Sequence, residues 1–234
     1  MTVELNIDLG ELPDEAEELY EIATTVNIAC GGHAGDATSM KRAVMLAARY
    51  NAKVAAHPSY PDVSGFGRRT RFASPEVTRD AVALQCTKLH AIADAAGLDV
   101  RAIKPHGALY HDASNDADYA AALIDGCLRA MPELALVVGF PNTALGDIVE
   151  ARGIGFVREG FADRRYDEHW QLLPRSRPDA VLTDIESCVT QALSLARMGR
   201  IETICVHGDT PNALVIGRAV RQALEAEGLL VGAH

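Results

Sequence analysis

The sequence lacks long hydrophobic runs and an excess of basic residues. No stretch of 18 apolar residues occurs in the 234-residue chain, so no membrane-spanning helix is predicted. The 22 Lys and Arg residues are outnumbered by 32 Asp and Glu residues, which gives a formal net charge of −10. Such an acidic balance disfavours non-specific binding to phosphate backbones or anionic lipid. We therefore expect no nucleic-acid partner and no membrane association.

Paired cysteines and a secretion signal are also missing. The five cysteines are odd in number, scattered and without a C-x-x-C pair, which favours reduced thiols over a disulfide framework or a zinc knuckle. The segment Met1–Asn6 lacks the basic and apolar regions of a signal peptide. These absences predict a cytoplasmic protein.

Several familiar site signatures do not occur. There is no G-x-x-x-x-G-K-[ST] phosphate loop, no H-E-x-x-H, no G-x-S-x-G elbow and no G-x-G-x-x-G. If the protein uses ATP, we expect this chain not to bind it through a recognised phosphate loop.

What the sequence does contain is a regular alternation of short apolar segments and helical segments. Strands are predicted at Val3–Asp8, Thr25–Ala29, Lys53–His57, Arg101–Pro105, Leu134–Gly139, Ile154–Arg158 and Thr203–His207. Helices are predicted at Asp14–Ala23, Asp36–Tyr50, Ser74–Gly97, Asp116–Met131, Asn142–Arg152, Asp184–Met198 and Pro211–Glu227. The strands look apolar on both faces, as is typical of parallel strands buried on both sides. The alternation predicts an α/β fold with a parallel sheet, either a closed barrel or an open doubly wound sheet.

The length favours the barrel. Seven units in 234 residues give about 33 residues each, close to the roughly 30 of one βαβ unit. No linker or shift in composition divides the chain, so we predict a single domain over residues 1–234. The stretch Glu159–Thr183 is the one long irregular segment, and long loops in compact domains are often functional.

Polar residues gather where the predicted strands end, which is where loops of parallel α/β folds build their sites. The candidates are Asp8, Asn27, Gly31, His33, His57, Arg68, Arg69, Lys104, His106, Glu159, His207 and Asp209. Four of the eight histidines fall in this set, and desolvating four imidazoles needs a functional reason. A structural interpretation stays open for each residue alone. A single His can be a hydrogen-bonded core residue, Gly31 can serve only its turn, and Arg68 and Arg69 can form a solvated surface.

Motifs in order along nearly the whole chain resemble the LamB/YcsF family. They are Leu5–Glu11, Asn27–Asp36, His57–Asp62 with Gly65–Arg69, Lys104–Tyr110, Phe161–Tyr166 and Cys205–Pro211. The resemblance implies a single-domain, deformed (β/α)7 TIM-like barrel, similar to the glycoside hydrolase/deacetylase barrels. It also implies the A subunit of an ATP-dependent 5-oxoprolinase, which hydrolyses 5-oxo-L-proline to L-glutamate. The implied cofactor is ATP with Mg²⁺, and the implied partners are 5-oxoprolinase subunits B and C.

The strand-end residues suit this chemistry. A five-membered lactam is a poor electrophile, and phosphorylation of its amide oxygen would let water displace the phosphate. The site would need cations, a general base, a proton donor and an anchor for the substrate carboxylate. We predict Lys104 as the oxyanion or phosphate group, Asp8 or Asp209 as the base, His57, His106 and His207 as proton-transfer groups, and Arg68 or Arg69 as the anchor. We predict substrate-binding positions at Asn27, Gly31, His33 and Glu159 as well.

Two other functions remain open from the sequence. The first is a metal-dependent deacetylase or amidohydrolase, in which Asp8 and two of His33, His57, His106 and His207 hold a transition metal. No helix-spaced ligand pair supports that set, and the sequence does not identify a metal. The second is a non-catalytic subunit that binds the substrate while its partners perform the chemistry.

Overall fold

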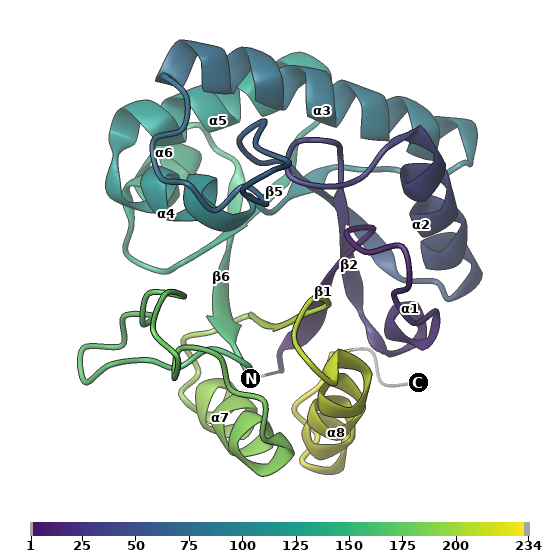
Figure 1. Ribbon diagram of the computed structural model, residues 1–234, viewed down its shortest axis with the longest axis vertical. Helices are drawn as coiled ribbons and strands as arrows, with labels where there is room; N and C mark the ends of the chain where they lie inside the picture. Colours follow the sequence, from purple (N-terminus) through teal and green to yellow (C-terminus); the bar gives the residue numbers. More distant parts are fainter. Residues whose placement is uncertain (1, 232–234) are drawn as a thin grey trace.

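Seven parallel strands close into a barrel in the computed structural model, which describes residues 2–231. Each strand pairs with the next along the chain, and β7 pairs back onto β1. The closed barrel predicted from the alternating pattern is therefore confirmed, and the open sheet is excluded. In Figure 1 the helices surround the strands, with α3 and α5 on one side and α7 and α8 on the opposite side.

The strands are β1 (Glu4–Leu9), β2 (Thr25–Ala29), β3 (Lys53–His57), β4 (Ala102–Ile103), β5 (Leu136–Gly139), β6 (Gly155–Phe161) and β7 (Thr203–His207). The helices are α1 (Glu18–Ile22), α2 (Ala37–Arg49), α3 (Pro75–Ala95), α4 (Gly107–Asn115), α5 (Ala117–Ala130), α6 (Ala144–Ala151), α7 (Ile185–Arg197) and α8 (Ala213–Ala226).

The side chains of β1 and β2 that point into the barrel are mostly polar, contrary to the sequence prediction of strands that are apolar on both faces. Ile7 and Ile28 point outward into the hydrophobic cluster that β1 and β2 share with the helices. The alternating residues Asn6, Asp8 and Asn27 point inward and bond one another: the Asn27 amide donates to Asn6 Oδ1 and Asp8 Oδ1, both at 2.7 Å. These buried polar groups largely satisfy one another, and among them Asn27 Oδ1 alone has no hydrogen-bond partner in the described residues.

Strand register brings the site residues to one rim. Asp8 stands opposite Asn27 of β2 and opposite His207 of β7, and His57 stands opposite Ala29. Because all strands run in the same direction, their carboxyl ends meet at this rim.

Several elements differ from the prediction for local reasons. Strand β6 continues to Phe161, because residues 159–161 pair with β7, so Glu159 lies in a strand and not in the irregular segment. Helix α1 is short because Glu15 turns back to accept the N–H of Gly10 (2.8 Å) and the hydroxyl of Tyr20. Helix α4 was not predicted, since it begins at a glycine with φ +57°.

Two expectations from composition can be compared with the structure. All five cysteines are buried and free of disulfide bonds, as predicted for reduced thiols. Within residues 2–231, no helix combines the length and the apolar character needed to span a membrane.

Candidate active site

A cavity of about 320 Å³ opens at the carboxyl-terminal rim of the barrel. Its wall combines strand-end residues with part of the segment that joins β6 to α7 and projects from the barrel in Figure 1. The polar and aromatic residues of the wall are Asp8, His57, Arg68, Thr70, Lys104, His106, Tyr110, His111, Phe161, Arg164, Arg175 and His207. Its volume falls in the range of small-molecule sites.

Lys104 is the cation at the base of the cavity and is 2% exposed. Its Nζ lies 2.9 Å from Asp8 Oδ1, 2.8 Å from Glu159 Oε1 and 3.1 Å from Asn6 Oδ1. Burial by itself lowers the pKa of Lys104, but Asp8, Cys205 and Glu159 outweigh it and raise the pKa well above its ordinary value. A buried lysine needs an anionic partner, and here two carboxylates serve as partners.

Asp8 is an ionised carboxylate at the rim. Its Oδ1 accepts from Lys104 and Asn27, and its Oδ2 lies 3.4 Å from His57 Nε2. Burial raises the pKa of Asp8, but His57 and Lys104 together lower it well below its ordinary value. A carboxylate held this firmly in its charged form is a weak base and a strong partner for positive charge.

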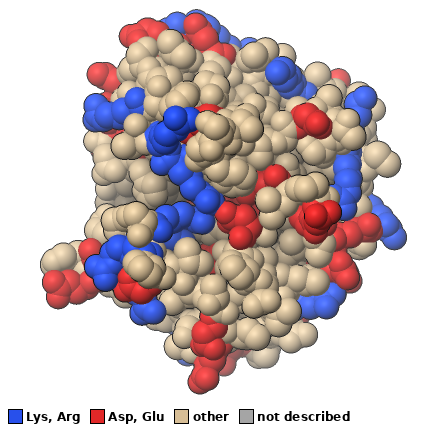
Figure 2. Space-filling view, in the orientation of Figure 1, with Lys and Arg blue, Asp and Glu red and all other residues tan. Residues whose placement is uncertain are grey.

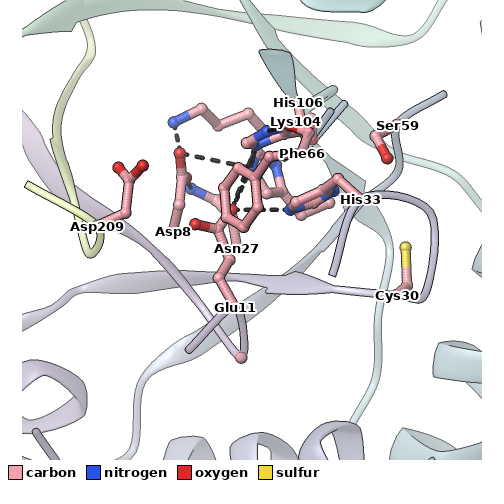
Figure 3. A network of polar contacts seen from close by, with 12 residues as sticks. Asp8, Glu11, Asn27, Cys30, His33, Ser59, Phe66, Lys104, His106 and Asp209 are labelled. Carbon is pink, nitrogen blue, oxygen red and sulfur yellow. Dashed lines mark hydrogen bonds and ion pairs between the residues drawn. The ribbon is translucent and has the colours of Figure 1, made fainter. Parts of the chain in front are cut away.

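Glu11 is the centre of a histidine cluster that the sequence analysis did not select. Its Oε1 lies 2.8 Å from His33 Nε2, 3.2 Å from His106 Nδ1 and 3.7 Å from His57 Nε2. Figure 3 shows the contacts of Glu11 running to the histidines, while Asp209 stands apart from Asp8. Burial raises the pKa of Glu11, and its contacts with His106 and His33 lower it well below its ordinary value. The motif Leu5–Glu11, which ends two residues after β1, was the available signal.

Asp163 and His207 form a carboxylate–imidazole pair on the other side of the cavity. His207 Nδ1 lies 2.9 Å from Asp163 Oδ1, and Asp163 Oδ2 accepts from the His207 backbone N–H (3.0 Å) and the Thr210 hydroxyl (2.6 Å). Burial raises the pKa of Asp163, but His207 and Thr210 lower it overall. A carboxylate on Nδ1 fixes the tautomer and leaves Nε2 as the free base, on a histidine that lines the cavity.

Arginines supply positive charge at the cavity mouth. Arg68, Arg164 and Arg175 all line the cavity, and Arg164 is anchored by its bond to the Leu173 carbonyl (2.7 Å). Burial lowers the pKa of Arg164 to about 10. Asp209 pairs with Arg68 and lies 3.6 Å from Arg175 Nη1. In the space-filling view, Lys and Arg side chains gather on one part of this face and border acidic side chains near its centre (Figure 2).

Two groups of side chains within residues 2–231 place metal-ligating atoms within 4.8 Å of one another. The first is Glu11, His33, His57 and His106, and the second is Asp8, Cys205 and His207. Both groups lie at the same rim of the barrel. The site therefore has ligand atoms for a cation as well as positively charged side chains for an anion.

The sequence model of the LamB/YcsF family matches residues 3–233. The chain belongs to the LamB/YcsF family.

Curated and solved relatives agree with this assignment. The LamB/YcsF chain is 40% identical over 248 residues to the A subunit of 5-oxoprolinase from Pyrococcus horikoshii, covering 99% of this chain and 97% of the relative. It matches the crystal structure of a lactam utilization protein from Thermus thermophilus with a TM-score of 0.90 and 36% identity, over 100% of both chains.

A more distant structure bears on the fold alone. The catalytic domain of a peptidoglycan N-acetylglucosamine deacetylase from Eubacterium rectale matches with a TM-score of 0.54 and 15% identity, over 99% of this chain and 89% of the other. This likeness confirms the expected similarity to the deacetylase barrels.

The structure divides the predicted site residues of this LamB/YcsF chain into three sets. The residues that line the cavity are Asp8, His57, Arg68, Lys104, His106 and His207. A second set bonds other charged residues of the site: Asn27 donates to Asp8, Glu159 pairs with Lys104, and His33 contacts Glu11. The third set has other contacts. Asp209 pairs with Arg68, the Arg69 guanidinium binds the Asp62 carboxylate, and Gly31 lies in a turn with φ +97°.

The functional roles of all these residues stay predictions. The polar and aromatic cavity-wall residues that sequence reasoning did not select are Thr70, Tyr110, His111, Phe161, Arg164 and Arg175. Tyr110, Arg164 and the buried Asp163 fall in the quoted motifs, but a motif does not tell which of its side chains turns inward. His111 and Arg175 gave no comparable signal.

Proposed function

We propose that this chain is the A subunit of an ATP-dependent 5-oxoprolinase that hydrolyses 5-oxo-L-proline to L-glutamate. The observation that carries the proposal is the full-length similarity to relatives named as the A subunit of 5-oxoprolinase, at 37–41% identity over 99% of this chain. The overall reaction consumes two waters. One opens the ring C–N bond, and the other accounts for cleavage of ATP to ADP and phosphate.

The charge at the cavity mouth suits an anionic substrate. 5-Oxoproline carries one carboxylate, and a guanidinium is the side chain that binds a carboxylate in bidentate fashion. Arg68 has the required exposure, with 36% of its side chain open to solvent, and it lines the cavity. We assign Arg68 as the carboxylate anchor in preference to Arg69, because both are paired with a carboxylate, Asp209 and Asp62 respectively, but only Arg68 lines the cavity.

His207 is the proton-transfer group that the geometry favours. Asp163 holds its Nδ1, so Nε2 can take a proton from the attacking water and return it to the ring nitrogen when the C–N bond breaks. Asp8 is the weaker base, because His57 and Lys104 hold it ionised. Its part is to keep negative charge beside Lys104 and the histidines.

The nucleotide and the partners belong to the same proposal. The naming of the relatives as one subunit of an enzyme supports the partner subunits B and C. ATP with Mg²⁺ is proposed from the resemblance to the LamB/YcsF family, since the chain has no recognised phosphate loop. The cationic side of the cavity offers a place for charge that develops on phosphate during transfer.

The test measures glutamate released from 5-oxoproline by the purified chain, with both partner subunits present or omitted and with ATP and Mg²⁺ present or omitted. We expect turnover only when all components are present. No glutamate from the complete mixture would overturn the proposal. Release without ATP would favour the amidohydrolase, and full turnover by a His207→Asn complex would favour a subunit that only binds.

A further inference from the structure

We propose that Glu11, His57 and His106 bind one divalent transition-metal ion, such as zinc, beside the cavity. The proposal stands on the cluster's geometry and does not depend on which substrate the cavity takes. It concerns the donors around Glu11, and not the separate group of Asp8, Cys205 and His207.

The first argument is the direction of the imidazole lone pairs. His57 Nδ1 lies 2.6 Å from the Lys104 carbonyl oxygen, and His106 Nε2 lies 3.0 Å from the Phe66 carbonyl oxygen. A carbonyl oxygen only accepts, so each of these nitrogens carries the hydrogen. His57 Nε2 and His106 Nδ1 are then bare in the neutral rings, and they face each other at 3.1 Å. Glu11 Oε1 adds a third acceptor beside them.

The two bare imidazole nitrogens face each other at 3.1 Å with no hydrogen between them, and the donor to Glu11 Oε1 is His33 Nε2, so a cation is needed between the two imidazoles. The candidates are a shared proton and a metal ion. Metal-binding histidines almost always donate their other ring N–H to a carbonyl or carboxylate, and both His57 and His106 do so here. The outer hydrogen bonds of the cluster are therefore those of a metal site.

The distances among the three donors also fit one ion. A tetrahedral zinc site with Zn–N bonds of about 2.0–2.1 Å places its ligand atoms about 3.3 Å apart. The spacings are 3.1 Å between His57 Nε2 and His106 Nδ1, 3.2 Å between His106 Nδ1 and Glu11 Oε1, and 3.7 Å between His57 Nε2 and Glu11 Oε1. The two rings stand 89° apart, so both lone pairs can point to one place.

His33 is a positioning residue and not a ligand in this arrangement. Its ring is stacked on that of His106, with centroids 3.6 Å apart and planes 2° from parallel. A ligated metal lies in the plane of its imidazole, and one ion cannot lie in both of these planes. His33 Nε2 instead contacts Glu11 at 2.8 Å and orients the carboxylate.

The types of ligand indicate the class of metal and whether a substrate can reach the ion. Two imidazoles with one carboxylate suit zinc or a related transition metal and leave a coordination position open, whereas calcium and magnesium prefer all-oxygen sites. His57 and His106 line the cavity, so the open position faces the place where a substrate would lie. Close packing at Gly67, where a Cβ would come 2.9 Å from His33 Cβ and 3.1 Å from His106 Cδ2, keeps the rings together.

The experiment removes metal with a chelator and titrates the full-length chain with Co²⁺ or Zn²⁺ alone. Cobalt absorption reports the ligands, calorimetry the affinity, and elemental analysis the stoichiometry. We expect one ion per chain. Glu11→Gln and His57→Asn should weaken binding by more than the roughly 10–100-fold expected for loss of an orienting residue, and His33→Asn should fall within that range.

The matched control is His207→Asn, which alters the second donor group and should bind cobalt as the wild type does. Each variant is first checked for its native circular dichroism and its cooperative unfolding. The proposal is overturned if the wild-type chain takes up no cobalt, or if His207→Asn abolishes binding while His57→Asn retains it. It is also overturned if nitrogen NMR finds a proton shared by His57 and His106 that persists under saturating Zn²⁺.

Discussion

At the scale of the residue, one carboxylate decides what His207 can do. Asp163 binds Nδ1, so the nitrogen available at the cavity is Nε2. Under the proposed function, His207→Asn in the assembled enzyme should lower kcat by about 10²–10⁴-fold, the range for loss of a general acid–base group. Steady-state glutamate release measures this. His90→Asn, on α3 and away from the cavity, is the control and should keep wild-type turnover.

Asp163 also makes stability depend on pH in a defined direction. Its folded pKa is below the unfolded value of about 3.8, so its stabilisation is fully present above that pH and is lost as pH falls through the folded pKa. The difference in unfolding free energy between wild type and Asp163→Asn should therefore shrink below about pH 4. Urea unfolding at several pH values tests this, and a constant difference down to about pH 2.5 would contradict it.

Lys104 is the shared cation of two buried carboxylates. Its removal should lower the stability of the fold, whatever its effect on catalysis. Lys104→Met leaves Asp8 and Glu159 without their cation and should lower the unfolding free energy by about 3–5 kcal/mol. Adding Asp8→Asn and Glu159→Gln should recover much of that loss, because the charges are then gone. Equal stability of wild type and Lys104→Met in urea would show that the charges are not coupled.

At the scale of the element, the start of α4 carries a steric constraint. Gly107 has φ +57°, and a Cβ there would lie 2.6 Å from the Gly67 carbonyl oxygen. Gly153 has a similar φ of +69° with no atom within 4 Å of the added Cβ. Gly153→Ala should cost about 1–2 kcal/mol for the left-handed backbone alone, and Gly107→Ala clearly more. Urea unfolding compares the two, and equal losses would mean that the loop at Gly67 yields freely.

The sequence predicted an element well where the local residue pattern alone marks its two ends. The predicted bounds of β2, β3 and β7 match the structure, because these strands are bounded by clear turns or helices. It failed at α4, where a glycine at a left-handed position begins the helix, and at β6, where pairing with β7 extends the strand. Local patterns cannot reveal pairing between segments that are distant in the chain.

The site was predictable in place but not in detail. Parallel strands bring their ends together, so Asp8, His57 and His207 could be expected at one rim. The sequence could not predict which of these side chains bond one another. Arg68 and Arg69 are adjacent in the sequence, yet one lines the cavity and the other binds Asp62, because the turn points them differently.

At the scale of the whole molecule, the segment after α8 is hydrogen-bonded to the residue that precedes β1. The Val3 N–H donates to the Leu229 carbonyl (2.7 Å), and the Val231 N–H donates to the Val3 carbonyl (2.9 Å). Leu230 is buried in the cluster that contains Val3 and Leu5. Leu230→Ala should cost about 2–5 kcal/mol, whereas Val231→Ala, on the surface, should stay within about 0.5 kcal/mol of wild type. Thermal and urea unfolding distinguish the two, and a small loss at Leu230 would mean that this segment contributes little.

The pairing of β1 with both β2 and β7 has a consequence for biosynthesis. Of the seven barrel strands, β1 is synthesised first, yet its second neighbour, β7, is synthesised last. Until β7 emerges, one edge of β1 has no partner and is open to wrong pairing or to a chaperone. Asp8 stands beside His207 only after that closure. A chain whose translation stops early therefore carries most of the polar residues of the rim but cannot assemble them, so an unfinished product has no working site.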